Sequence, residues 1–289
     1  MRNIRLNLGA SPIWFKKGWY IVDHKIKKTN KTTIAGDAAN IDLPDESCSV
    51  VFCSHVFEHI PHYRLPIILS EINRILEPGG VFRILIPDLE LLCKKYVEKD
   101  IDFFMKAKLE DENIRTDLGI GGMLMNFIVS PGQDTILLDR NISEFIGGYA
   151  HIYSYDFEML KIMLKRLGFL NIIRSEFCSS SVEEMREPLH VAHLEPVWVS
   201  INKEFYEKHN LIHRLVDGKY EINFKLTGFD RNPLYSLIIE CKKDKYVNKS
   251  DADLFFNKSV QNYNIYGKSL LSYPEVTNKL KKCKINYKK

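Results

Sequence analysis

The sequence lacks any apolar run approaching the about 18 residues that cross a bilayer, which excludes a membrane span. The first residues, Met1 to Arg5, also lack the apolar stretch of a secretory signal. The six cysteines form no CxxC pair and have no histidine partner at zinc-finger spacing. We therefore expect reduced thiols and a cytoplasmic location.

A basic character is also missing from most of the chain, although the net charge is +4. Segment 242–289 holds twelve lysines against four acidic residues, a balance of +8, so residues 1–241 carry −4. This distribution does not favour a nucleic-acid-binding face on the main domain, and we expect no nucleic-acid partner. We interpret 242–289 as a basic C-terminal extension in solvent, with binding to an acidic surface as the alternative.

The 289 residues are enough for one large α/β domain or two small ones, and 45% of them are apolar. A helix is predicted over 65–76, where apolar residues recur at helical spacing, and Pro78-Gly79-Gly80 is expected to end it. Short runs typical of strands occupy 4–8, 19–22, 32–35, 49–53 and 81–86. Their alternation with helices and loops predicts a Rossmann-like, doubly wound α/β sheet that is mostly parallel.

The second half of the chain is less regular. Glycines between 100 and 148 interrupt any long helix, and we interpret this segment as a lid-like insertion over the carboxyl edge of the sheet. A second insertion, 179–231, is expected to hold a helix near 203–215. A helix over 155–167 and strands over 171–177 and 233–241 complete a single domain, 1–241.

Polar or flexible residues follow the predicted strands, at the edge where parallel sheets bind ligands. Asp23, at the end of the second strand, can accept both hydroxyls of a ribose. Asp37, after the third strand, can accept a hydrogen bond from an adenine amino group, whereas its alternative role is that of a turn residue or helix cap. With Gly9 after the first strand, suitable residues at three successive strand ends favour a nucleotide-like ligand.

In this order, the segments resemble the class I S-adenosylmethionine-dependent methyltransferases, in the branch that includes quinone-biosynthesis-like and sugar or natural-product enzymes. The most specific segment runs from Glu71-Ile72-Asn73-Arg74 to Glu77-Pro78-Gly79-Gly80-Val81 and is followed by Ile86-Pro87-Asp88-Leu89. Segments 5–9, 18–23, 36–45 and 47–60 resemble the family's glycine motif, ribose acid, adenine loop and fourth strand with its helix. The resemblance covers residues 4–92 and extends more loosely to 241.

The resemblance implies S-adenosyl-L-methionine as cofactor and an antiparallel last strand. The cofactor-binding residues that it implies are Asn7, Gly9, Ala10, Asp23, Asp37, Ala38, Ser54 and His55. Two features differ from the family pattern: Ala10-Ser11-Pro12 replaces a second glycine, and fourteen positions separate Gly9 from Asp23, so the first helix is short or absent. A non-catalytic relative that serves as a binding or scaffolding module is therefore the alternative function.

Methylation of an alcohol benefits from a general base, and candidates are His55, Glu58, His59, Asp88 and His151. We predict His151 and His55 as the catalytic residues, whereas the pair Glu58 and His59 is interpreted as structural.

No metal site is predicted, since His190 and His193 have no evident third ligand. The amino-methylating signature of the family is absent after the fourth strand, where Cys53-Ser54-His55-Val56 stands. The resemblance therefore implies O-methylation of a small metabolite, sugar or glycan precursor.

Overall fold

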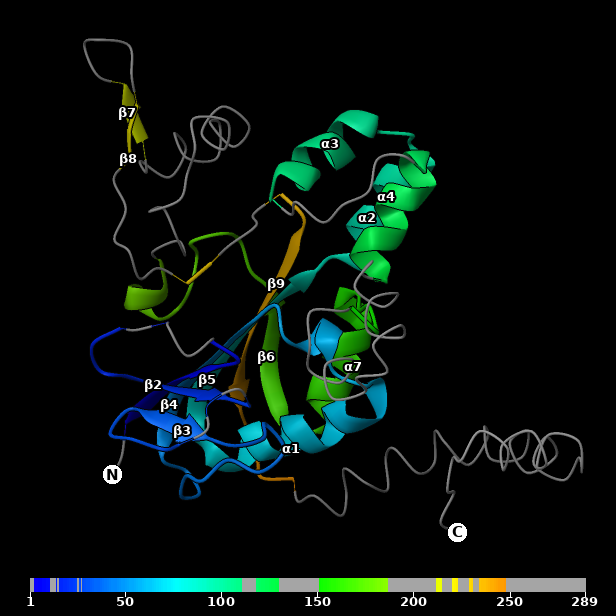
Figure 1. Ribbon diagram of the computed structural model, residues 1–289. Helices are drawn as coiled ribbons and strands as arrows, with labels where there is room; N and C mark the ends of the chain where they lie inside the picture. The colour runs from blue at the N-terminus through cyan, green and yellow to red at the C-terminus, as the bar shows by residue number, and fades with distance from the viewer. Residues whose placement is uncertain are drawn as a thin grey trace, which may run out of the picture.

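The computed structural model describes residues 3–10, 14, 16–24, 26, 28–110, 118–129, 151–186, 212–214, 220–222, 229–230 and 234–247 (Figure 1). Several predicted features lie outside these residues. They are Ser11, Pro12, His190 and His193, much of the insertion 100–148, most of the connection 179–231, and the extension beyond 247.

The centre of the molecule is a seven-stranded sheet with the strand order β3-β2-β1-β4-β5-β9-β6 (Figure 1). Its strands are β1 Ile4–Leu8, β2 Trp19–Asp23, β3 Thr33–Ala35, β4 Cys48–Ser54, β5 Leu76–Pro87, β6 Phe169–Arg174 and β9 Ser236–Lys243. The first five strands pair in parallel, whereas β9 is antiparallel to both β5 and β6. The Rossmann-like fold and the antiparallel last strand are thus confirmed.

The central strands are apolar on both faces because both faces are buried. In β4, Val51 and Cys53 lie in one apolar cluster, whereas Val50 and Phe52 lie in another. The same alternation follows β5 and β9, as the two-residue period of a strand requires.

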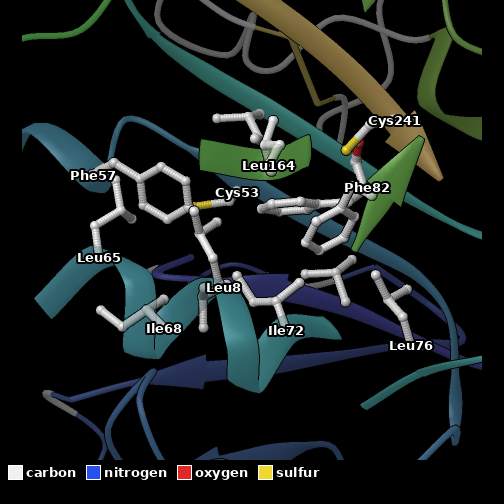
Figure 2. Packing of buried hydrophobic residues seen from close by; sticks show 14 of the residues in the cluster. Leu8, Cys53, Phe57, Leu65, Ile68, Ile72, Leu76, Phe82, Leu164 and Cys241 are labelled. Carbon is white, nitrogen blue, oxygen red and sulfur yellow. The ribbon is translucent and has the colours of Figure 1, made fainter. Parts of the chain in front are cut away.

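Two helices, α1 Leu65–Ile75 and α7 Phe157–Arg166, lie on one side of the sheet (Figure 1). Figure 2 shows Leu65, Ile68 and Ile72 of α1 directed at Leu8 and Cys53 of the strands. The i, i+3 and i+7 spacing places these α1 side chains on one stripe, and their burial stabilises the helix against the sheet. The Asp156 carboxylate caps α7 by accepting a hydrogen bond from Met159 N at 2.8 Å.

The opposite face of the sheet is covered differently. Among the described residues, the connections β1–β2, β2–β3 and β3–β4 contain no helix. Residues 11–13 and 15 of the first connection lie outside the described part of the chain, so the short or absent first helix stays a prediction. Instead Phe177, Met185 and Phe229, which come from the chain beyond β6, pack on Trp19 and Phe52. Three short 3₁₀ helices are η1 Phe57–His59, η2 His62–Arg64 and η3 Glu183–Arg186.

Beyond β5, the helices α2 Leu89–Val97, α3 Ile101–Glu110 and α4 Gly119–Ile128 form a group with an apolar cluster of its own (Figure 1). This cluster includes Leu92, Phe104 and Phe127, and Tyr235 joins it to the start of β9. None of the helices in the described part of the chain is both long and apolar enough to span a bilayer.

Four local predictions differ from the structure. Helix α1 ends at Ile75, because Leu76 is already extended and pairs with Cys48, so Pro78-Gly79-Gly80 lies within an irregular part of β5. Strand β6 begins at Phe169 and ends at Arg174, earlier than the predicted 171–177. The helix near 203–215 is wrong for Ile212–Arg214, which is strand β7 and pairs with β8 Tyr220–Ile222. The glycines at 119, 121 and 122 lie inside α4 rather than interrupting a helix.

Candidate active site at the carboxyl edge of the sheet

The first part of the site is the turn after β1. Gly9 has a φ of +72°, and a Cβ atom there would lie 2.4 Å from Val56 Cγ2. Gly9 N donates to Val22 O at 2.7 Å, which holds the turn against β2. Glycine is therefore required both by its conformation and by the close approach of the segment after β4.

The end of β2 places a carboxylate beside this turn. Because Leu8 pairs with Val22, Asp23 is the residue of β2 that lies next to Gly9. Asp23 is 8% exposed, and its Oδ1 lies 3.6 Å from His24 Nδ1. A mostly buried carboxylate beside a glycine turn is an arrangement that receives ribose hydroxyls in nucleotide-binding sheets.

Asp37, the predicted adenine contact, already has protein partners. Its Oδ1 accepts from Ala39 N at 2.9 Å and its Oδ2 accepts from Arg64 Nη2 at 2.5 Å. Desolvation raises the pKa of Asp37, but the Ala39 N–H and the Arg64 guanidinium lower it more, so the net shift is downward. The adjacent Ala38 packs against the main core.

The loop that carries these residues is held by α1. Arg74 donates to the carbonyl oxygens of Leu43 and Ile41 at 2.8 and 2.9 Å. The buried Glu71 accepts from Ile41 N at 2.7 Å and is paired with Arg74 at 2.8 Å. The most specific part of the sequence resemblance therefore positions the site rather than lining it.

The end of β4 supplies His55, which has a φ of +52° and donates its N–H to Leu85 O at 2.8 Å. Its Nε2 lies 2.9 Å from Ser236 Oγ, and its Nδ1 lies 3.1 Å from Glu58 Oε1. An ionised carboxylate only accepts, so Nδ1 donates to Glu58 and Nε2 accepts from Ser236. Both ring nitrogens of His55 thus have partners inside the protein, and the side chain is 4% exposed.

Beyond His55, a second group of side chains surrounds a buried acid. The acid is Glu58, which is 1% exposed. One nitrogen or oxygen atom of each side chain lies within 4.8 Å of the corresponding atom of the others in a group of three: Glu58, His59 and His151. The rings of His59 and His151 meet edge to face with centroids 4.9 Å apart. Desolvation raises the pKa of Glu58, but the hydrogen bond from His55 and the electrostatic influence of His55, His59 and His151 lower it to about 2.

Backbone contacts bring His151 to this acid from a distant part of the sequence. Ile152 N and Tyr153 N donate to Glu58 O at 2.8 and 3.3 Å. His151 Nδ1 lies 2.7 Å from Phe127 O of α4, and since a carbonyl only accepts, Nδ1 carries the proton. The lone pair of a neutral His151 is therefore on Nε2.

The structure thus brings the sequence-predicted site residues together in two groups. Gly9, Asp23 and Ser54 lie at adjoining strand ends, since β1 is paired with both β2 and β4. His55 and His151 both contact or adjoin Glu58, an acid that the sequence interpretation left outside the site. The spacing His55-x-x-Glu58-His59 was the available signal, but only the fold adds His151 to it.

Asp88, another candidate base, has structural partners instead. Its carboxylate caps α2 by accepting from Leu91 N at 3.3 Å and pairs with Arg174 at 2.7 Å. It is 3% exposed, and these two contacts fix the end of β5.

Comparison with known proteins gives one family match. Residues 20–84 match the family model described as a methyltransferase domain, a stretch that includes β2, β3, β4 and α1 and extends into β5. None of the curated proteins compared with the chain matches it.

Two solved structures illustrate the similarity, each at low sequence identity. One is a SAM-dependent methyltransferase from Archaeoglobus fulgidus, with 16% identity over 84% of this chain and 86% of that chain and a TM-score of 0.37. Another is an S-adenosylmethionine-dependent methyltransferase from Mesorhizobium loti, with 12% identity over 83% of this chain and 90% of that chain and a TM-score of 0.40.

The strand-end residues fit S-adenosylmethionine. The turn at Gly9 has no space for a side chain, so its backbone can approach a ligand closely. Beside it, the carboxylate oxygens of Asp23 can accept hydrogen bonds from the ribose hydroxyls. The matched stretch contains Asp23, Asp37 and Ser54 at its strand ends. Residues 20–84, at this edge of a Rossmann-like sheet, thus resemble a methyltransferase domain.

Proposed function

We propose that the chain methylates an oxygen atom of a small metabolite, sugar or glycan precursor. The observation that supports this most is the Glu58–His59–His151 group, which lies just beyond the cofactor edge at the end of β4. Basic nitrogens beside the expected methyl donor suit an acceptor hydroxyl, because a hydroxyl must lose its proton to become a strong nucleophile.

On the cofactor side, Asn7, Gly9, Ala10, Asp23, Asp37, Ala38, Ser54 and His55 are the residues that we assign to the binding of S-adenosylmethionine. When bound, the cofactor supplies an electrophilic methyl group. Asp23 would accept the ribose hydroxyls, and the segment around Ala38 would border the adenine. The −4 charge of residues 1–241 is favourable for a cationic cofactor.

On the acceptor side, we assign His151 and His55 to different tasks. Phe127 O fixes the His151 tautomer, so that Nε2 is the atom that serves the acceptor hydroxyl, which loses its proton at this group. His55, with both nitrogens in contact inside the protein, is a positioning residue that holds Glu58.

The test of this function is a product assay with purified protein, S-adenosylmethionine and matched panels of hydroxyl and amine acceptors. We expect a methyl ether, identified by mass spectrometry, with an equal amount of S-adenosylhomocysteine. His151→Ala is expected to lower kcat about 100- to 10,000-fold, while calorimetry shows unchanged S-adenosylhomocysteine binding. Lys161→Ala, in an exposed ion pair on α7, is the control. Methylation of amines alone would overturn the proposal.

The positioning role of His55 has a separate test. His55→Asn retains an N–H donor toward Glu58, whereas His55→Ala does not. A hydrogen bond to a charged group contributes about 1.5–3 kcal/mol, so His55→Asn should recover at least about tenfold of the kcat lost in His55→Ala. Equal kcat values in the two variants would contradict this role.

A further inference from the structure

We propose that Glu58, His59 and His151 bind one divalent transition-metal ion. The three residues come from η1 and from the segment before α7, and the fold places one ligand atom of each within 4.8 Å of the others. Two imidazoles and one carboxylate are a ligand set that proteins use for Zn²⁺ and for Fe²⁺.

The burial of Glu58 is a second, independent observation. Its side chain is 2% exposed, and its Oε1 contacts His55 at 3.1 Å. Its Oε2 is buried and has no hydrogen-bond partner among the residues that the structure describes. A buried carboxylate oxygen without a partner is costly, and a bound cation would satisfy it.

The distances are close to those that an ion requires. Zinc bonds to nitrogen or carboxylate oxygen are about 2.1 Å long, so two ligands of one tetrahedral ion lie about 3.4 Å apart. The ligand atoms of this group lie within 4.8 Å of one another, so the longest separation has to close by at most about 1.4 Å. His59 and His151 are half-buried, and their rings contact each other edge to face.

The surroundings of the three residues resemble the outer contacts of known metal sites. Metal-binding histidines commonly donate their other N–H to a carbonyl or carboxylate, and His151 does so to Phe127 O at 2.7 Å. The carboxylate of Glu58 is oriented by His55, which is oriented in turn by Ser236. These contacts restrict the orientations of the Glu58 carboxylate and the His151 ring.

This inference deepens the proposed function and depends on it only for its catalytic consequence. Three protein ligands leave coordination positions for an acceptor hydroxyl, whose pKa the ion would lower. The hydroxyl proton leaves to solvent, the oxygen forms the new bond to the methyl carbon, and the carbon–sulfur electron pair remains on sulfur. In this scheme His151 Nε2 binds the ion, so the ion takes the place of Nε2 as the group that activates the hydroxyl, and His151 contributes to kcat by holding the ion.

The experiment measures metal binding directly, without turnover. Chelator-treated full-length protein is titrated with Zn²⁺, Mn²⁺ or Mg²⁺ by calorimetry, and bound metal is counted by mass spectrometry after desalting. We expect one Zn²⁺ or Mn²⁺ per chain and a higher Tm with the ion, whereas Mg²⁺, which prefers all-oxygen ligands, binds at least about tenfold more weakly.

Variants separate this site from other metal-binding groups. Glu58→Gln and His151→Ala should each weaken binding at least about 100-fold, while His62→Gln, a half-buried histidine stacked on Tyr153, should leave it unchanged. If Glu58→Gln does not fold, His59→Ala and His151→Ala serve in its place, because each removes one proposed ligand and should weaken metal binding. Absence of stoichiometric binding, or equal binding by His151→Ala, would overturn the inference.

The two proposals fail in different ways. Metal binding without methyl-ether formation would contradict the proposed function and leave the metal site supported. Methyl-ether formation that continues unchanged in a chelator, by protein that binds no metal, would contradict the metal site and support the function.

Discussion

At the residue scale, the position of Asp23 at the end of β2 determines where a carboxylate faces the expected cofactor. Its carboxylate is placed by β2 next to the Gly9 turn, and the residue is 8% exposed. Preorganisation of this kind reduces the entropy lost on binding, because the acceptor oxygens are already in place.

We therefore predict that Asp23→Asn weakens S-adenosylhomocysteine binding about 10- to 100-fold, since hydrogen bonds to a charged acceptor contribute about 1.5–3 kcal/mol. Isothermal titration calorimetry measures this change. Asp42→Asn, at an exposed position on the loop before β4, should bind as the unmodified chain does. If the two variants bind S-adenosylhomocysteine with equal affinity, Asp23 does not contact the cofactor.

Asp37 and Arg64 predict a pH dependence of stability. The folded-state pKa of Asp37 is lowered, so the folded protein binds fewer protons than the unfolded chain near the ordinary value of 3.8. The contribution of the pair is therefore present above that value and is lost as the pH falls through the lowered pKa. Asp37 is 51% exposed, so the contribution is below about 1 kcal/mol.

Urea denaturation of Arg64→Gln measures this contribution. At about pH 6 the variant should be less stable by a few tenths of a kcal/mol, and near pH 3 the difference should become smaller. A loss of the same size at both pH values would show that Arg64 acts through packing rather than through the Asp37 charge.

At the scale of elements, α1 connects the site to the rest of the sheet. Glu71 and Arg74 hold the loop after β3, as described above. Asn73, on the same helix, holds the chain segments that follow α7 and β9. Its Nδ2 donates to Leu167 O and Lys245 O, both at 3.0 Å. These carbonyls follow α7 and β9, so one amide joins three elements.

Asn73→Ala should lower the free energy of unfolding by about 1–3 kcal/mol, because buried carbonyl oxygens lose their donor. Thermal and urea denaturation measure the change. Lys161→Ala, which removes an exposed ion pair on α7, should change stability by less than about 0.5 kcal/mol. A similar small effect from Asn73→Ala would show that water replaces its hydrogen bonds.

At the scale of the molecule, the described contacts of the sheet continue past the predicted domain end at 241. Lys243 is 3% exposed and donates to Leu76 O at 2.7 Å. Val247 O accepts from Ser70 of α1 at 2.9 Å. The boundary at 241 stays a prediction, and these contacts give two different truncations with which to test it.

A chain that ends at Val247 should keep its Tm and its cofactor affinity, because every contact described above is retained. A chain that ends at Cys241 loses the last two residues of β9 and the Lys243 and Val247 contacts, and its Tm should fall by several degrees. Differential scanning calorimetry of both chains checks this. Equal Tm values would place the end of the folded domain at 241.

The sequence alone was enough to predict the Rossmann-like sheet, because apolar strands, a helical stripe at 65–76 and polar strand ends are local patterns. It also indicated Gly9, Asp23 and His55 as site residues from their place after strands. The ends of α1 and β6 were less accurate, since pairing with neighbouring strands decided them.

The tertiary structure decided what no local pattern contains. Phe177, Met185 and Phe229, which cover the second face of the sheet, come from beyond β6. His151 reaches Glu58 because the backbone after it bonds to η1. The interpretation of Glu58 and His59 as structural depends on their helix alone and stays a prediction. Burial, which removes water from Glu58 and sets its partners, arises only when distant segments pack together.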